Sequence, residues 1–323
     1  MQPNFLRLNK DILVATEKKI TMENVTYRGT PPGFTPEQWQ TFMQEGMLIF
    51  ENAIPDDEIQ EYLEAADRVV LADPTYKKGE YFGLQNFVER DPRLAGLIDH
   101  PRHVGYAYDI YGEQLKLQLS ELFLRTPGGL HNRWHPDGAR ALPYHIFSPL
   151  LPLHIKVGYW LTDLPRSKMG NFVYIPGSHR WQYLEAYDTY DSVAGEEILR
   201  VPKGTMTIMH GSIWHRVEAN ESNVTRKNLF LAYCPSWITS ADRLTSNPQW
   251  LSTLNREQRI IMRSYNYAYS HAKPPEEDYP LFLERENGLD RDPGVYTDRI
   301  SLGRRKRKTV AEKFLEAYPT VAA

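Results

Sequence analysis

The order of apolar and polar residues divides the chain into a helical beginning and a longer part rich in strands. Residues 35–38 combine an N-cap threonine, a proline at the first helical position and a capping-box glutamine, so a helix is predicted to run to about Glu45. Gly46 ends this helix, residues 47–51 form a short apolar strand, and a second helix is predicted over 55–71. The first clear elements are therefore helix, strand and helix.

From Leu115 onward the period of the pattern changes to two. Leucines at 115, 117 and 119 alternate with Lys116, Gln118 and Ser120, as in a half-buried strand. Further strands are predicted over 154–162, 171–175, 204–209, 214–218 and 227–233. Many short strands between proline and glycine turns, behind a helical layer, predict a mainly β fold with flanking helices. The expected architecture is a double-stranded β-helix, the jelly-roll or cupin-like barrel.

The same pattern predicts one domain with an extension at each end. Residues 1–33 are irregular and end in Pro31-Pro32-Gly33, and residues 34–270 form the single domain. Residues 271–323 are predicted to be a C-terminal extension of loop plus helix. Just before it, the alternating tyrosines 265, 267 and 269 predict one more strand or an extended aromatic arm.

Composition narrows the class of protein. With 41% hydrophobic and 24% charged residues in 323, the chain is typical of globular proteins. A formal charge of -3 gives no general attraction for nucleic acid or an anionic membrane, and the basic cluster 304–308 is interpreted as a solvated face. The single cysteine, Cys234, excludes intrachain disulfides, and no signal-like or 18-residue apolar run is present, so a cytoplasmic location is expected.

Three residues have the composition of a metal site. His135 and Asp137 flank Pro136, His215 follows Asp137 by 78 positions, and Arg226 follows His215 by 11. In an extended backbone residues i and i+2 project to the same side, so His135 and Asp137 can reach one ion. Two imidazoles and one carboxylate are the ligand set of non-heme Fe(II) oxygenases. A His-x-Asp alone arises often by chance, and a surface hydrogen-bonded pair is the alternative, but the ordered set favours the metal site.

The sequence motifs around these residues resemble those of a known family. Trp134-His135-Pro136-Asp137-Gly138, Ile175-Pro176-Gly177-Ser178-His179, the stretch from His210 to His215, and Arg226 opening an apolar run resemble the phytanoyl-CoA dioxygenase family of Fe(II)/2-oxoglutarate oxygenases. The resemblance covers about residues 34–236. It implies Fe(II), 2-oxoglutarate and O2 as cofactor and co-substrates, and oxidation of a C–H bond with release of succinate and CO2. Either His210 or His215 could be the distal ligand, and the family pattern favours His215.

A co-substrate site follows from Arg226. An arginine pointing into a barrel needs an anion, and a planar guanidinium can take the distal carboxylate of 2-oxoglutarate bidentately. The resemblance implies further polar contacts from Gln118 and Asn228. Trp160 is expected to wall the same pocket or to be a core aromatic residue.

The substrate is the feature of the protein that the sequence indicates least. We expect a small organic metabolite, amino-acid-like or from secondary metabolism, contacted by Tyr81, Phe82 and either His154 or Lys156. Related halogenases have a small residue at the position of Asp137, so the carboxylate present here implies, through the family resemblance, oxygenation or another oxidation rather than halogenation. Three alternatives stay open: an acyl-CoA substrate, a cupin-type metalloprotein that does not use 2-oxoglutarate, and a non-catalytic binding protein. The protein is expected to act as a monomer or homodimer.

Overall fold

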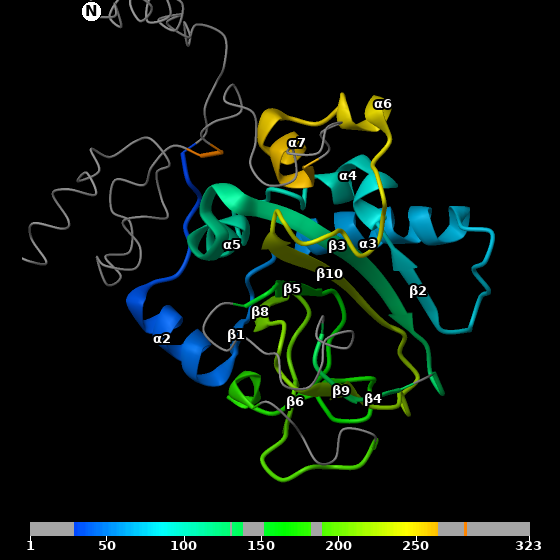
Figure 1. Ribbon diagram of the computed structural model, residues 1–323. Helices are drawn as coiled ribbons and strands as arrows, with labels where there is room; N and C mark the ends of the chain where they lie inside the picture. Colours follow the sequence, from blue (N-terminus) through cyan, green and yellow to red (C-terminus); the bar gives the residue numbers. More distant parts are fainter. Residues whose placement is uncertain (1–28, 130, 138–151, 182–188, 264–280, 283–323) are drawn as a thin grey trace, which may run out of the picture.

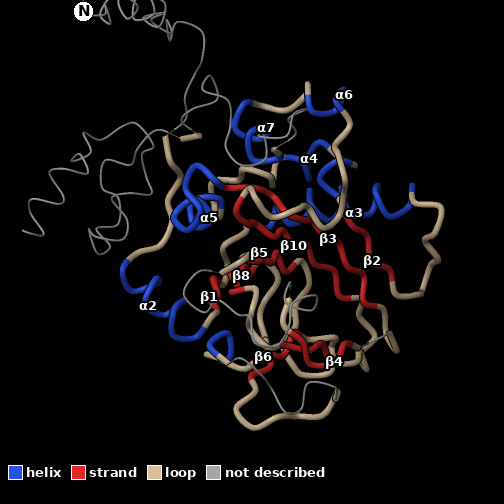
Figure 2. The backbone as a smooth tube through the Cα atoms, viewed as in Figure 1, coloured by secondary structure: helices blue, strands red, loops and turns tan. Residues whose placement is uncertain are grey.

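The computed structural model describes residues 29–129, 131–137, 152–181, 189–263 and 281–282. Within them, two antiparallel sheets lie face to face, and the helices gather along the outer side of the larger sheet (Figure 1). The larger sheet has the strand order β1-β8-β5-β10-β3-β2 and the smaller one β4-β9-β6-β7. Figure 2 shows the two groups of strands and the helical layer separately. This arrangement is the predicted jelly roll with flanking helices.

From β3 onward the chain passes several times between the two sheets, which places distant segments side by side. In the larger sheet the strands are β1 (Met47–Phe50), β2 (Phe82–Gln85), β3 (Leu115–Arg125), β5 (Ile155–Trp160), β8 (Thr205–His210) and β10 (Arg226–Pro235). In the smaller sheet they are β4 (Asn132–His135), β6 (Phe172–Tyr174), β7 (Glu197–Ile198) and β9 (His215–Val217). The described helices are α2 (Pro36–Glu45), α3 (Asp56–Ala72), α4 (Pro92–Ala95), α5 (Val104–Tyr111), α6 (Pro248–Leu251) and α7 (Arg256–Met262). None of these helices could cross a membrane.

The predicted first helix forms for the predicted reason. The Thr35 hydroxyl accepts from the backbone N–H of Gln38, the Gln38 side chain accepts from the backbone N–H of Thr35, and Gly46 closes the helix in the left-handed region at φ 75°. The strand predicted from Leu115 onward is β3, which continues to Arg125. The predicted arm at 265–269, the basic cluster 304–308 and the C-terminal helix lie outside the described residues.

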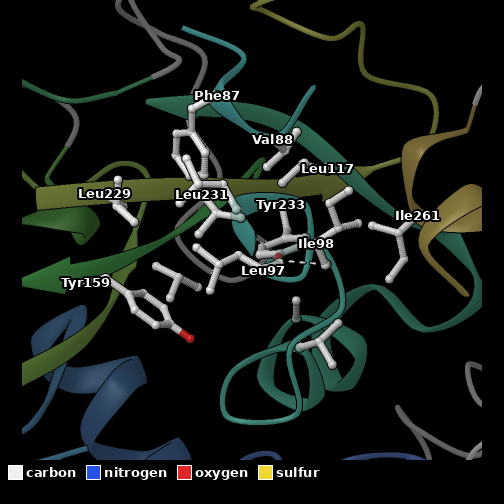
Figure 3. Packing of buried hydrophobic residues seen from close by; sticks show 14 of the residues in the cluster. Phe87, Val88, Leu97, Ile98, Leu117, Tyr159, Leu229, Leu231, Tyr233 and Ile261 are labelled. Carbon is white, nitrogen blue, oxygen red and sulfur yellow. Dashed lines mark hydrogen bonds between the residues drawn. The ribbon is translucent and has the colours of Figure 1, made fainter. Parts of the chain in front are cut away.

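Strand β10 separates two compartments. Its residues Leu229, Leu231 and Tyr233 face the helices and belong to the main hydrophobic core (Figure 3). Phe230, on the opposite face, packs between the sheets in a second cluster with residues such as Trp160 and Phe172. The hydrophobic core between the helices and the larger sheet therefore holds that sheet in place, and the opposite face of the same sheet lines the barrel interior.

A buried histidine joins the helical layer to the sheet. The imidazole of His103 lies between the hydroxyls of Tyr159 and Tyr233, with N–O distances of 2.8 and 2.7 Å. The Tyr233 hydroxyl also donates to the carbonyl of Ile98 at 2.9 Å. That hydroxyl therefore accepts from Nε2 of His103, and in the neutral ring Nδ1 then accepts from the hydroxyl of Tyr159. Burial lowers the pKa of His103 well below its ordinary value.

We predict that the metal-free protein loses stability below about pH 6.5. Burial lowers the pKa of His100 to about 4 and of His210 to about 3, and also lowers the pKa values of His103 and His179. The unfolded chain then binds more protons than the fold below the ordinary histidine pKa, so stability is full above it and falls as pH decreases. From pH 7.5 to 5.5 we expect a loss of roughly 1 kcal/mol per buried histidine, measured by urea unfolding.

The matched controls are two phenylalanine variants. His210→Phe should remove one histidine's share of this pH dependence, whereas His131→Phe, at an exposed position, should leave it unchanged. A free energy of unfolding that stays constant from pH 7.5 to 5.5 would contradict the prediction.

Candidate metal centre and co-substrate pocket

The two predicted histidine ligands are cross-strand partners in the smaller sheet. His135 at the end of β4 is paired in register with His215 at the start of β9, and their ring centroids are 4.3 Å apart. Nε2 of His135 lies 3.9 Å from Oδ1 of Asp137, and Nε2 of His215 lies 3.8 Å from Oδ2 of the same carboxylate. Each residue offers one ligand atom, and the three atoms all lie within 4.8 Å of one another. In the described parts of the chain, no other His, Cys, Asp and Glu group forms such a cluster.

The hydrogen bonds of the two imidazole rings leave Nε2 as the metal-ligating atom of each histidine. Nδ1 of His135 lies 2.6 Å from the carbonyl oxygen of Arg133, and Nδ1 of His215 lies 3.0 Å from that of Ile213. A carbonyl can only accept, so both Nδ1 atoms carry the proton, and in each ring the lone pair that can bind a metal is that of Nε2. Burial alone would raise the pKa of Asp137, but neighbouring positive charge, led by Lys156, holds it well below its usual value. Two neutral imidazoles and one carboxylate fit Fe(II).

The structure separates the two candidates for the distal ligand. His210 ends β8 and lies on the helical side of the larger sheet, where its ring packs against Phe42 and His179. His215 is the histidine that meets His135 and Asp137. The two histidines lie apart because the turn after His210 carries the chain from the larger sheet to the smaller one, where His215 begins β9.

Polar groups without partners lie at the start of β10. Arg226 is 2% exposed; its Nη1 donates to the carbonyl of Gly170, and its Cζ lies 5.4 Å from the ring centroid of Trp160. Its Nε has no hydrogen-bond partner in the described structure, and neither do the two amide atoms of Asn228, which is 1% exposed. Buried polar atoms are costly when unpaired. Arg226 and Asn228 therefore form a cradle suited to a carboxylate-bearing ligand, with Trp160 as one wall.

The structure places Lys156 against a metal ligand. Its ammonium lies 2.7 Å from Oδ2 of Asp137, 3.2 Å from Oε2 of Glu121 and 4.9 Å from the ring centroid of Phe230. Glu121 was missed by the sequence reasoning, because simple alternation places it on the face of Leu115 and Leu117, whereas the register shift at Gln118 turns it to the inner face. Gly158 makes room for this packing, since a Cβ there would lie 2.8 Å from a Phe230 ring carbon.

Two other predicted residues lie on the inner side. His154 is 4% exposed, and Gly211 gives its ring space, because a Cβ on Gly211 would lie 2.5 Å from Cε1. Burial lowers the pKa of His154 to about 4, so its ring is neutral at pH 7. Tyr81 stacks on Phe123 with ring centroids 6.4 Å apart.

Two predicted residues are placed differently. Phe82 belongs to the core on the helical side and packs edge-on against Tyr76, which corrects the expectation that it contacts substrate. Neighbouring residues of a strand face opposite sides, so Tyr81 and Phe82 could not both point inward. Gln118 is the residue skipped by the register of β3 with β10, at a β-bulge where Leu119 pairs with Ala232. Its contact with the co-substrate stays a prediction.

Comparison with known proteins agrees with this geometry. Residues 42–228 match the family model for phytanoyl-CoA dioxygenase (PhyH). A protein of Stutzerimonas stutzeri named as a probable alpha-ketoglutarate-dependent hypophosphite dioxygenase is 25% identical over 232 residues, which are 61% of this chain and 77% of that protein.

Two solved structures share the fold. HygX from Streptomyces hygroscopicus, solved with nickel and 2-oxoglutarate bound, superposes with a TM-score of 0.55 at 18% identity, over 65% of this chain and 90% of HygX. The non-heme alpha-ketoglutarate-dependent carbocyclase SnoK from nogalamycin biosynthesis gives 0.52 at 21% identity, over 70% and 94% of the chains. The family match spans more than half of the chain and includes the His135, Asp137 and His215 cluster and Arg226. The chain therefore belongs to the phytanoyl-CoA dioxygenase family and is a non-heme, 2-oxoglutarate-dependent iron dioxygenase.

Proposed function

We propose that this dioxygenase binds Fe(II) through His135, Asp137 and His215, holds the distal carboxylate of 2-oxoglutarate on Arg226, and hydroxylates a free small metabolite. The observation that carries the proposal is the pairing of two features in one barrel. A donor cluster of the Fe(II) type lies on the smaller sheet, and a buried guanidinium with an unpaired Nε lies on the inner face of the larger sheet. A cupin-type metalloprotein would not need the second feature.

When bound, Fe(II) and 2-oxoglutarate would supply the oxidising power, with O2 consumed and 2-oxoglutarate converted to succinate and CO2. The chain's own residues bind and orient. The carbonyls of Arg133 and Ile213 fix the two imidazoles in the tautomer that presents Nε2. Trp160 and Phe230 exclude water from the inner face. Asn228 is proposed to donate its amide to the co-substrate beside Arg226.

We infer a small polar substrate, bound by residues near the metal ligands. Tyr81, His154 and Lys156 offer a hydroxyl, a neutral imidazole and an ammonium in or beside the inner face. HygX has been solved with hygromycin B bound, and SnoK belongs to nogalamycin biosynthesis, so secondary metabolism is the proposed setting. A coenzyme A ester would need a phosphate-binding patch, and the basic cluster 304–308 lies outside the described residues. A single catalytic domain over 34–270, a cytoplasmic location and a monomer or homodimer complete the proposal.

The substrate class is tested with a panel of free metabolites, including amino acids and hypophosphite, beside acyl-CoA esters. We expect free metabolites to stimulate succinate release from 2-oxoglutarate in the presence of Fe(II) and ascorbate. Stimulation by the CoA esters alone, lost when residues 304–308 are neutralised, would show that the substrate is a thioester.

We predict one Fe(II) per chain and loss of tight binding in His135→Ala, Asp137→Ala and His215→Ala. Each substitution removes one of three donors from an otherwise intact sheet. Metal affinity is measured by calorimetry with Fe(II) under anaerobic conditions. His210→Ala is the matched control and should bind iron normally. Weak binding in His210→Ala together with normal binding in His215→Ala would reverse the choice of distal ligand.

We predict that Arg226→Met raises the dissociation constant for 2-oxoglutarate by roughly ten- to a hundred-fold, because a charge-assisted contact contributes about 1.5 to 3 kcal/mol. Lys227→Met is the matched control. Lys227 is the next cation on β10 but points to the other face, where it pairs with Asp67 at 2.5 Å. An unchanged affinity in Arg226→Met would favour a metalloprotein that does not use 2-oxoglutarate.

A further inference from the structure

A second buried arginine lies directly beside Arg226. Arg125, the last residue of β3, is paired in register with Arg226, the first residue of β10. Both are 2% exposed. Residues directly opposite each other in an antiparallel pair have Cβ atoms about 5 Å apart, and like charges there repel. The two strands therefore bring two guanidinium groups together where water is excluded.

Aromatic rings flank the two cations on either side. The guanidinium carbon of Arg125 lies 5.2 Å from the ring centroid of Tyr81, and that of Arg226 lies 5.4 Å from the ring centroid of Trp160. Across the sheet the strands run β5, β10, β3 and β2; Trp160 ends β5 and Tyr81 directly precedes β2, so the two rings come from the outer sides of the arginine-bearing strands. Rings of this kind stabilise a guanidinium through its face, whereas a planar anion is bound through its N–H edge, so the two interactions do not compete.

The arrangement lacks negative charge at Arg226. No described acidic residue forms an ion pair with Arg226, and its Nε is buried without a hydrogen-bond partner. Burial lowers the pKa of Arg226 well below its ordinary value, and the neighbouring charge of Arg125 lowers it further. Two like charges held together out of water are costly unless an anion lies between them.

We propose that Arg125 is a second co-substrate-binding residue, and that the distal carboxylate of 2-oxoglutarate is held jointly by Arg226 and Arg125. This inference rests on the proposed co-substrate site and adds a residue to it. The role would be specific to the distal carboxylate, because in the proposed site the keto acid end of the co-substrate would lie toward His135, Asp137 and His215. Arg125 thereby selects dicarboxylic over monocarboxylic 2-oxo acids.

The test is equilibrium binding to the Mn(II)-loaded protein, which avoids turnover. Two ligands are compared by calorimetry: 2-oxoglutarate, and 2-oxopentanoate, which has the same chain length but a methyl group in place of the distal carboxylate. Arg125→Met should weaken 2-oxoglutarate binding by roughly ten-fold or more while changing 2-oxopentanoate binding by less than about two-fold. Arg125→Lys keeps the charge and loses the fork, so it should fall between wild type and Arg125→Met.

The double variant tests whether the two arginines hold one carboxylate. If they do, Arg125→Met combined with Arg226→Met should weaken 2-oxoglutarate binding by less than the product of the two single effects. Normal Mn(II) affinity serves as the check that each variant is folded. Should Arg125→Met not fold, the ligand comparison in Arg125→Lys decides: equal losses for both ligands, or no loss, would overturn the inference.

The outcomes separate this inference from the proposed function. Weakened 2-oxoglutarate binding in Arg226→Met but wild-type binding in Arg125→Met would refute the role of Arg125 alone. Wild-type binding in both would refute the co-substrate site itself.

Discussion

The alternation of side chains along β10 is the constraint on which the rest of the structure depends. Both faces of this strand are buried, so each residue belongs either to the core beneath the helices or to the interior between the sheets. Leu229 and Leu231 anchor the strand in the core, and this fixes Arg226 and Asn228 on the inner face. A shift of one residue would place the guanidinium under the helices and a leucine in the pocket. The hydrophobic core therefore sets the register that positions the polar site.

The site lies between the sheets and draws on both. The smaller sheet supplies His135 and His215, with Asp137 just beyond β4, and the larger sheet supplies the guanidinium of Arg226. A metal ion alone would be held by one sheet. A co-substrate that reaches from the metal to Arg226 would contact both, so its binding depends on how the sheets are spaced, which the apolar cluster around Trp160, Phe172 and Phe230 maintains.

Much of the fold and of the metal site could be predicted from the sequence, because the patterns that indicate them are local. The capping box at Thr35, the period of two in the strands and the His-x-Asp spacing each depend on neighbours within a few residues. What failed depended on long-range register. Phe82 was assigned to the pocket although its strand position turns it to the helices, and the bulge at Gln118 has no signature in composition. The juxtaposition of Arg125 with Arg226 follows from strand pairing, which no single segment of sequence specifies.

Lys156 shows how such long-range contacts affect the metal centre. It extends from the inner face of the larger sheet to Oδ2 of Asp137 on the smaller-sheet side, and its second carboxylate partner, Glu121, lies on β3. A buried ammonium is tolerated because two carboxylates and the ring of Phe230 surround it. The ion pair with Asp137 crosses from one sheet to the other, so it ties a metal ligand to the sheet that carries the arginines. The separation between the metal and the carboxylate cradle is then set by a charged contact as well as by apolar packing.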